Sequence, residues 1–541
     1  MPTDKGVSPP KKSLSDHPDV EIRRRIAPDG EHLQLTQVAL QDRTDIHNEL
    51  VSERRWLLHP QEGEMNLEGN LFVVENVVSS RGWVFLKQAP LPHARPWYEG
   101  PDLRVRPGSG RGHEFQLFGP AESPPERGWH VLEYEGGRRE RTRVLHRWQA
   151  EMRPDSDSHR LPRFLTNTWG DRSQDSRVCE DFALREIRSA SRLGADVFQL
   201  DDGWQRGITG NSARSEEMDG RSEGFRAADP DFWEPHPERF PNGLEPVICA
   251  AREAGLETGL WFAPDPADEH ASWERDAARL CELYRSHGVR FFKIDGTRAE
   301  TRRADANLLR FYKRVSEHSD GEICMDVDVT GKALRGGYFG SLGAGPLFVE
   351  NRYTDWHGYW PHQTLRNLWQ LSHWIDPRAL RMEFLNRERN RENYTDDPLA
   401  PAHYAPDTLF ATVMFSNPLG WFETSNLPED YFDTVPPLVE CWRAHREELF
   451  TGTILPVGNP PDGMSYTGFL SIGEGDEGLG LVFREANPYS RGRIAMEEIV
   501  GGSFRCEVLA GKGACSWQRG TLKVEIPPRL GYVFFRFTRP D

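Results

Sequence analysis

The stretch Val289-Arg290-Phe291-Phe292-Lys293-Ile294-Asp295 decides the fold of this chain. It is a short, mostly apolar run, and its length and composition are typical of a buried parallel strand. Asp295 is therefore expected at the C-terminal tip of that strand, and Gly296 and Thr297 follow it directly. Lys293 lies two residues before Asp295 and shares its face, because side chains alternate along a strand.

Two other runs end in acids in the same way. One is Val197-Phe198-Gln199-Leu200-Asp201-Asp202-Gly203-Trp204, and the other is Pro346-Leu347-Phe348-Val349-Glu350-Asn351. Enzymes built on parallel barrels place their active sites at the C-terminal ends of the strands. Three strands tipped with carboxylates therefore predict an active site that works through carboxylates.

From Leu161 onward, apolar runs of strand length alternate with helical segments, which is the pattern of parallel βαβ units. The expected strands are Phe164–Trp169, Val197–Trp204, Glu257–Phe262, Arg290–Asp295, Glu322–Val329, Pro346–Asn351, Leu380–Leu385 and Thr412–Pro418. The clearest helices are Glu180–Leu193, Ala267–His287, Arg302–His318 and Trp360–Ile375. This series predicts an α/β fold, a (β/α)8 TIM barrel. A doubly wound open sheet is the alternative, although no glycine-rich fingerprint follows the first strand.

Antiparallel β domains are expected on both sides of the barrel. Short strands such as Trp83-Val84-Phe85-Leu86, separated by Gly- and Pro-rich turns, predict an N-terminal β-sandwich. Alternating strands such as Leu522-Lys523-Val524-Glu525-Ile526 predict a small C-terminal antiparallel β domain. The predicted boundaries are 1–25 for a disordered tail, 26–160 for the sandwich, 161–450 for the barrel and 451–541 for the C-terminal domain.

Composition and charge exclude several classes of protein. The formal net charge of −17 argues against a polyanionic partner such as nucleic acid. The seven cysteines form no CxxC pair, which favours reduced thiols and a cytoplasmic location. The N-terminus lacks the apolar core of a secretory signal, and no apolar stretch reaches membrane-spanning length. We therefore expect no nucleic-acid partner and no membrane partner, while a homo-oligomer stays open.

The acids suit the cleavage of a glycosidic bond with retention, which requires one carboxylate to attack and one carboxylic acid to protonate the leaving oxygen. Asp295 is the expected nucleophile, and Lys293 would keep it ionised, although a purely structural ion pair is the alternative. Glu350 is the expected acid, because strand ends hold side chains more rigidly than loops. Asp355 is the rival acid. Arg352 is expected to bind substrate unless it forms a salt bridge with one of these acids.

Other acids and tryptophans at the strand ends are expected to hold a sugar. Asp201 and Asp202 offer acceptors for adjacent hydroxyl groups, with metal binding or helix capping as the alternative. Trp204 supplies a ring that can stack beneath the sugar, and Trp261 is expected to line the same pocket. Packing in the core is the alternative for both rings.

The fifth strand and the histidines complete the set of candidate residues. Asp326 and Asp328 lie on one face of that strand and are expected to reach the ligand or to pair with the basic residues just beyond them. His357 and His362 are separated by glycine and proline, and no third ligand is obvious. We therefore expect no metal and no cofactor.

With these residues in view, the chain resembles the family 36 glycoside hydrolases, the α-galactosidase and raffinose-synthase group, with kinship to families 27 and 31. Lys293-Ile294-Asp295 stands where that group has Lys-Trp-Asp, and Leu200-Asp201-Asp202-Gly203-Trp204 is similar to its sugar-binding motif on strand two. Gly259-Leu260-Trp261-Phe262-Ala263-Pro264 is similar to its Gly-Leu-Trp-Phe-Glu-Pro. Phe348-Val349-Glu350-Asn351 falls where the group carries its acid.

The resemblance implies a retaining α-glycosidase, α-galactosidase-like, that removes terminal α-linked sugars from oligosaccharides or glycosides by a two-carboxylate double displacement. The group's acid is an aspartate, whereas the candidate here is Glu350. Its Cys-Ser-Gly-Gly-Gly-Arg segment is replaced by Cys324-Met325-Asp326-Val327-Asp328-Val329-Thr330, so we expect specificity to have changed there. A transglycosidase of the same family and a non-catalytic carbohydrate-binding barrel are the alternatives.

Overall fold

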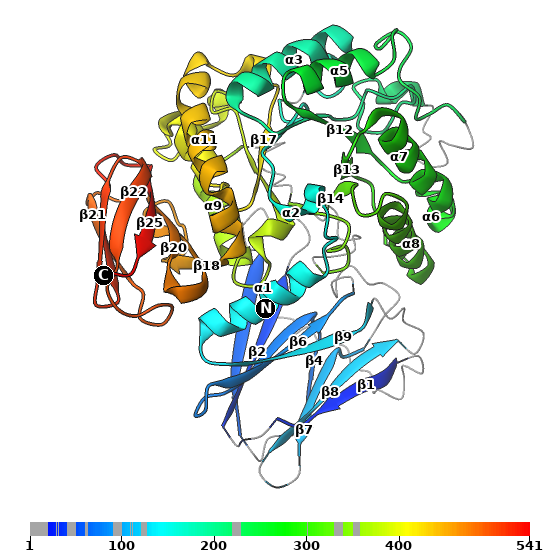
Figure 1. Ribbon diagram of the computed structural model, residues 1–541. Helices are drawn as coiled ribbons and strands as arrows, with labels where there is room; N and C mark the ends of the chain where they lie inside the picture. The colour runs from blue at the N-terminus through cyan, green and yellow to red at the C-terminus, as the bar shows by residue number, and fades with distance from the viewer. Residues whose placement is uncertain are drawn as a thin grey trace, which may run out of the picture.

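The structure is a computed structural model in which a barrel contacts two bodies of β-sheet (Figure 1). It describes residues 20–28, 30, 32–40, 50–59, 63–89, 100–108, 110, 112–120, 127–171, 173–218, 229–299, 301–328, 339–349 and 358–540. Residues 20–25, which the sequence assigned to a disordered tail, belong to strand β1 (Val20–Ile26) and pair with strand β8 (His113–Pro120).

The central body is a closed barrel whose strands are hydrogen-bonded in sequence order. They are β10 (Leu165–Asn167), β11 (Val197–Leu200), β12 (Glu257–Phe262), β13 (Phe291–Ile294), β14 (Cys324–Asp328), β15 (Leu347–Phe348), β16 (Leu380–Phe384) and β17 (Asn417–Trp421). The longer helices around them are α3 (Glu180–Leu193), α5 (Glu245–Glu253), α7 (Trp273–His287), α8 (Arg302–His318), α9 (Pro361–Leu371) and α11 (Glu429–Thr451). The predicted TIM barrel is confirmed, and the doubly wound open sheet is excluded.

The eighth strand lies later in the chain than predicted. The sequence placed it at Thr412–Pro418, whereas β17 is Asn417–Trp421. The apolar residues that suggested a strand instead continue from helix α10 (Pro406–Ala411) as tight turns, with Val413 N donating to Phe410 O at 3.1 Å. An apolar run alone does not distinguish buried turns from a buried strand.

One predicted helix is divided in two. The sequence pattern favoured a single helix over Ala267–His287, but the structure has α6 (Ala267–His270) and then α7. Asp268, Glu269 and His270 all have positive φ angles, of 46°, 60° and 59°. L-residues in this left-handed region cannot continue a right-handed helix, so the chain turns here.

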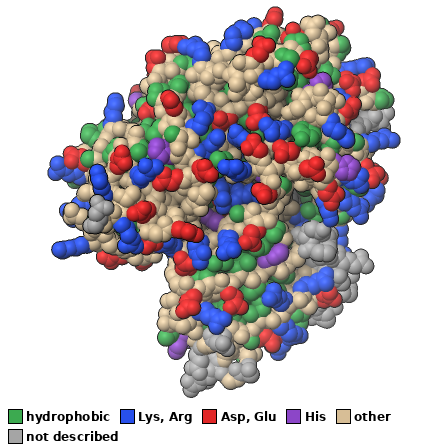
Figure 2. Space-filling model, in the orientation of Figure 1, with side chains coloured by type: hydrophobic (Ala, Val, Ile, Leu, Met, Phe, Trp, Pro, Cys, Tyr) green, Lys and Arg blue, Asp and Glu red, His purple; other side chains and the backbone are tan. Residues whose placement is uncertain are grey.

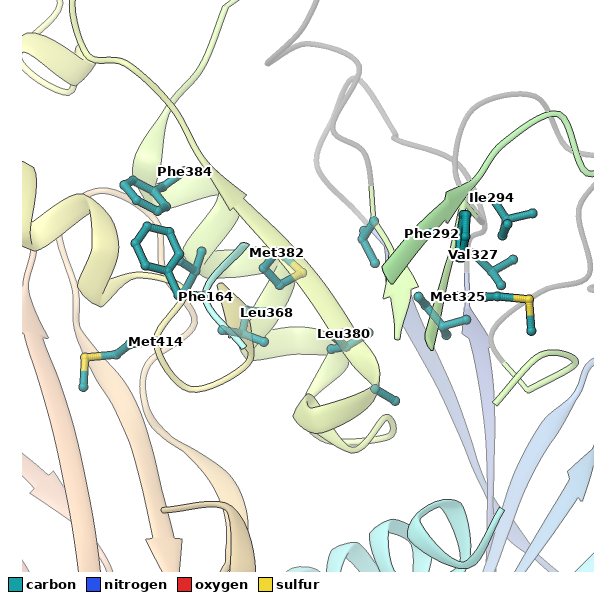
Figure 3. Packing of buried hydrophobic residues seen from close by; sticks show 14 of the residues in the cluster. Phe164, Phe292, Ile294, Met325, Val327, Leu368, Leu380, Met382, Phe384 and Met414 are labelled. Atoms are coloured by element: carbon teal, nitrogen blue, oxygen red, sulfur yellow. The ribbon is translucent and has the colours of Figure 1, made fainter. Parts of the chain in front are cut away.

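Strand β13 shows how the barrel sorts its side chains. Phe292 and Ile294 point outward into the apolar layer between strands and helices, together with Met325 and Val327 of β14 (Figure 3). Phe291 belongs instead to the small cluster that fills the barrel interior. Because side chains alternate, the positions two and four residues after Phe291 are those of Lys293 and Asp295, on the interior face.

The N-terminal body is a sandwich of two antiparallel sheets. One has the order β1-β8-β7-β4 and the other β3-β2-β5-β6-β9. The further strands are β2 (Leu33–Leu40), β3 (Val51–Leu58), β4 (Met65–Leu67), β5 (Leu71–Asn76), β6 (Arg81–Lys87), β7 (Leu103–Pro107) and β9 (Trp129–Glu135). Phe85 from one sheet meets Phe115 from the other with ring centroids 5.6 Å apart, so the two sheets share one core.

The C-terminal body is also built from two antiparallel sheets, in the orders β18-β19-β20-β25-β22 and β21-β24-β23. The strands are β18 (Thr453–Gly458), β19 (Tyr466–Ile472), β20 (Gly478–Arg484), β21 (Arg491–Ala495), β22 (Arg505–Gly511), β23 (Ala514–Gln518), β24 (Thr521–Glu525) and β25 (Gly531–Thr538). Trp517 and Phe537 join the two sheets, with ring centroids 5.1 Å apart. The predicted β domains on both sides of the barrel are therefore present.

Helix α1 (Arg138–Glu151) contacts all three bodies. Its Leu145 packs in one apolar cluster with Val84 of the N-terminal sandwich. Its buried Gln149 donates to Trp374 O and accepts from Asp376 N in the barrel, both at 2.8 Å. Its Arg139 forms a 2.6 Å ion pair with Asp476 of the C-terminal body.

The surface carries charges of both signs. On the face shown in Figure 2, acidic and basic side chains are interspersed rather than gathered into one area of a single sign. Among the helices of the described ranges, none combines the length and the apolar character needed to cross a membrane.

Candidate active site

Asp295 lies just beyond the C-terminal end of β13 and is half-buried. Its Oδ1 accepts a 2.6 Å hydrogen bond from the backbone N–H of Gly296. Its Oδ2 faces two further donors, Nε1 of Trp261 and Nδ2 of Asn211, each at 3.4 Å. Donors on both oxygens favour the ionised form of a carboxylate and fix its orientation. A carboxylate held in this way at the barrel mouth is suited to nucleophilic attack.

Lys293 lies deeper in the barrel and forms an ion pair with Asp201, with 3.0 Å between Nζ and Oδ2. The same oxygen of Asp201 accepts from Nδ2 of Asn167 at 2.7 Å. The ammonium group also lies 5.0 Å from the ring centre of Phe348 and 5.7 Å from that of Trp421. Aromatic faces attract a cation, so the pair is held in a defined place inside the barrel.

Asp202 points into its own loop. Its Oδ1 accepts from Nε2 of Gln205 at 2.6 Å, and its Oδ2 accepts a short hydrogen bond from the Thr209 hydroxyl. The side chain is only 1% exposed, and burial raises the pKa of Asp202 to about 7. These contacts commit both carboxylate oxygens to neighbouring residues of the chain.

The two predicted tryptophans have different surroundings. Trp204 is fully buried against Trp233, with ring centroids 6.0 Å apart, and its indole N–H donates to Trp261 O at 2.8 Å. Its ring is enclosed by other side chains, as the core-packing alternative expects, and the role of Trp204 in stacking on a sugar stays a prediction. Trp261 is also buried, but its indole N–H is directed at Asp295.

The acids of β14 are both buried. Asp326 lies beside Lys293 in the strand register, and its Oδ1 accepts from Nη2 of Arg381 at 3.0 Å. Burial raises the pKa of Asp326, and the charge of Arg381 opposes that rise. Asp328 ends the strand, and its carbonyl oxygen accepts from the hydroxyl of Thr297 at 3.4 Å. Asp326 is thus a partner of Arg381 inside the barrel, while Asp328 lies at its C-terminal end.

The predicted acids of the sixth strand, Glu350 and Asp355, lie outside the described residues, together with Arg352 and His357. The choice between the two acids stays a prediction. His362 lies in α9, and burial lowers its pKa to about 4. Within the described part of the chain, no group of three or more His, Cys, Asp or Glu side chains could hold a metal ion.

Sequence reasoning missed several residues of the mouth. Asn167 ends β10 and bridges Asp201 to Gln199, at 2.7 and 2.8 Å. Its signal was a polar residue at the end of an apolar strand, the same signal that singled out the acids. Asn211 lies in a long loop with no periodic pattern, and only the folded chain places it near Asp295.

A second set of acids occupies the mouth beyond β10 and β17. Asp171 accepts from the backbone N–H of Glu423 at 3.2 Å and from Nδ2 of Asn426 at 3.1 Å. Glu423 in turn forms a close ion pair with Arg177. Burial raises the pKa of Asp171 to about 6. This network ties together the loops that follow the first and the last strand of the barrel.

Comparisons with known proteins find α-galactosidases among the proteins similar to this chain. No protein-family description matches the chain. An α-galactosidase from Escherichia coli is 33% identical over 85 residues, which is 16% of this chain and 10% of that protein. Alpha-galactosidase Mel36A from Lactobacillus acidophilus is 30% identical over 132 residues, 24% of this chain and 14% of that protein. The chain thus aligns with a small part of these curated relatives.

The similarity of structure extends much further than that of sequence. The GH36 α-galactosidase AgaA from Geobacillus stearothermophilus has a TM-score of 0.63 at 13% identity, covering 95% of this chain and 76% of that one. A variant of AgaA in complex with raffinose has a TM-score of 0.65 at 13% identity, with the same coverage. The α-galactosidase from Lactobacillus brevis has a TM-score of 0.64 at 12% identity, covering 96% and 76%. The fold of this chain is therefore that of the GH36 α-galactosidases.

Proposed function

We propose that this chain is a divergent GH36-like enzyme, a retaining α-glycosidase that removes terminal α-linked sugars, with α-galactosides as the first substrates to consider. The observation that carries the proposal is Asp295, a half-buried carboxylate at the C-terminal end of a barrel strand with donors on both oxygens. The fold shared with GH36 α-galactosidases supports the same assignment.

In this mechanism Asp295 attacks the anomeric carbon and forms a covalent glycosyl-enzyme, while a carboxylic acid protonates the leaving oxygen. Glu350 and Asp355 are the candidates for that acid. The deprotonated group then activates a water molecule, which releases the sugar with its configuration retained. The Gly296 N–H holds Oδ1 of Asp295 at 2.6 Å, whereas the two donors on Oδ2 lie at 3.4 Å, so Oδ2 is the oxygen proposed to attack.

Lys293 and Asp201 are proposed to hold the terminal sugar below the attacking carboxylate. The two side chains form one buried ion pair inside the barrel, across strand β12, which separates β11 from β13. An ammonium group donates and a carboxylate accepts, so together they recognise adjacent hydroxyl groups. Trp261 and Asp328 lie at the same end of the barrel and complete the proposed subsite.

An α-linked oligosaccharide is the proposed natural substrate. Structures of AgaA variants contain raffinose or stachyose, which makes both sugars suitable candidates here. The replaced segment of the fifth strand contributes the Asp326–Arg381 ion pair, which alters the charge distribution beneath the sugar. We therefore propose that the panel of accepted sugars differs from that of α-galactosidases.

The test is a panel of aryl α-glycosides (galactoside, glucoside, N-acetylgalactosaminide and arabinopyranoside) together with raffinose. The wild-type chain is assayed beside Asp295→Ala and beside Asp433→Ala, which removes an exposed carboxylate on α11. We expect release from one substrate, loss of that release in Asp295→Ala only, and retention of configuration by NMR of the first product. Wild-type silence across the panel, or full activity in Asp295→Ala, would overturn the proposal.

A further inference from the structure

The loop that follows β11 is anchored from its N-terminal side by Asp202. This buried carboxylate accepts from Gln205 at 2.6 Å and from the hydroxyl of Thr209. The oxygen of that hydroxyl accepts in turn from the backbone N–H of Asn211, at 3.1 Å. A chain of hydrogen bonds thus runs from the end of a barrel strand to the backbone of Asn211.

A second buried carboxylate, Asp175, anchors the loop from the other side. Its Oδ2 accepts from the Ser212 hydroxyl at 2.6 Å, and its Oδ1 accepts from the backbone N–H of Ala213 at 2.7 Å. Arg239 donates to the same Oδ2 at 3.2 Å and compensates the charge. The residues directly after Asn211 are therefore fixed to a different segment of the barrel.

Between these two anchors, the side chain of Asn211 reaches the reactive group. Its Nδ2 lies 3.4 Å from Oδ2 of Asp295, the oxygen that Nε1 of Trp261 also faces at 3.4 Å. We propose that Asn211 is a positioning residue for Asp295, and that Asp175 and Asp202 serve to hold it there. This inference rests on the proposed function, because it takes Asp295 to be the carboxylate that attacks the sugar.

The physical reason is the cost of ordering an exposed side chain. Asn211 is exposed, and in a free loop its backbone and side chain would lose conformational entropy each time they were ordered beside Asp295. The buried carboxylates pre-order the loop during folding, so the amide is already in place when substrate arrives. A donor beside a carboxylate favours its ionised form, which is the form that attacks.

The experiment compares Asn211→Ala and Asn211→Asp with Asn242→Ala. Asn242 is a matched control because it is an exposed asparagine whose amide donates to the half-buried carboxylate of Glu180, at 3.2 Å. We expect Asn211→Ala to lower kcat about tenfold with a smaller change in KM, as for loss of one hydrogen bond to a charged group. We expect Asn211→Asp to move the acid limb of the kcat/KM profile to higher pH, because a second carboxylate disfavours ionisation of Asp295.

A merely structural role for Asn211 would not move the pH profile. The inference is overturned if both Asn211 variants keep the wild-type kcat and the wild-type acid limb while the wild-type chain is active. Thr209→Val is a second test of the inference. It removes the hydroxyl that links Asp202 to the backbone of Asn211, so it should also lower kcat although Asn211 itself is unchanged. Silence of the wild-type chain on every glycoside would instead overturn the proposed function, and this inference with it.

Discussion

Asp202 follows strand β11 and Asp295 follows strand β13 of the same barrel, yet the two carboxylates differ in burial and in the origin of their hydrogen-bond donors. Asp202 is 1% exposed, and both of its oxygens accept hydrogen bonds from its own loop. Asp295 is half-buried and lies at the mouth of the barrel, where its Oδ1 accepts from the backbone N–H of Gly296. The difference arises because Gln205 and Thr209, a few residues after Asp202, fold back and bind both of its oxygens, whereas Oδ2 of Asp295 faces donors from distant parts of the chain, Trp261 and Asn211. The course of the chain beyond a strand end therefore decides whether the acid there is buried by its own loop or stays half-buried at the barrel mouth.

The largest predicted effect is a loss of activity when Asp295 is replaced by the isosteric asparagine, and the same replacement of Asp202 is considered below. Asp295→Asn should lower kcat/KM by at least about a thousandfold, or about 4 kcal/mol, because the amide cannot attack. Its unfolding temperature should stay near that of the wild-type chain, since Asp295 is half-buried. Steady-state kinetics and thermal unfolding check both parts. A large loss of stability in Asp295→Asn would remove the contrast between the two acids.

Lys293→Met should cause the largest loss of stability. It leaves Asp201 buried without its cation, and breaking a buried ion pair on one side costs roughly 3–5 kcal/mol. The matched control is Lys523→Met, at an exposed position of β24, which should change little. Denaturant unfolding measures the difference. Adding Asp201→Asn to Lys293→Met should restore much of the loss, and no recovery would argue against the pair as its cause.

Asp202→Asn should change how stability depends on pH. Burial raises the pKa of Asp202 to about 7 in the folded chain, against roughly 3.9 in an unfolded one. Between these values the folded state binds the proton more tightly, so this group makes the wild-type free energy of unfolding fall as pH rises. The variant lacks this titration, so its unfolding temperature should fall less steeply from about pH 4 to 7. Parallel profiles would contradict the assignment.

The smallest predicted effects concern the two tryptophans, one of which should affect mainly activity and the other mainly stability. Trp261→Phe removes the N–H that faces Asp295 and should lower kcat/KM several-fold with little loss of stability. Trp204→Phe leaves the carbonyl of Trp261 without its donor inside the core, so stability should fall by about 1–3 kcal/mol. Kinetics and unfolding of both variants provide the check. The reverse pattern would show that Trp204, not Trp261, serves the chemistry.

Much of the barrel was predictable from the sequence because its strands are short apolar runs bounded by helices. Glu257–Phe262 was predicted with its observed bounds, and Arg290–Asp295 within one residue at each end. The eighth strand was not, because the buried turns after α10 are as apolar as a strand. The break after Ala267 depends on three left-handed residues, which no apolar periodicity reveals.

The positions of the candidate site residues were predictable where those residues lie at or near the ends of strands. Asp295, Lys293 and Asp201 follow from strand patterns, and the structure places all three in the barrel interior or at its mouth. Asn211 and Arg381 were missed, because their contacts join segments far apart in the chain. The stacking role of Trp204 stays a prediction, because a motif does not show which face of a ring the rest of the protein covers.

Helix α1 has a practical consequence for anyone who shortens this protein. The predicted barrel begins at residue 161, but the buried amide of Gln149 satisfies backbone groups of both Trp374 and Asp376. A fragment that starts at 161 would leave a buried carbonyl and a buried N–H without partners, and would expose the barrel surface that Leu145 covers. We therefore expect the smallest self-sufficient fragment that contains the barrel to start before Arg138 and to carry α1, a helix that the predicted boundaries assign to the N-terminal sandwich.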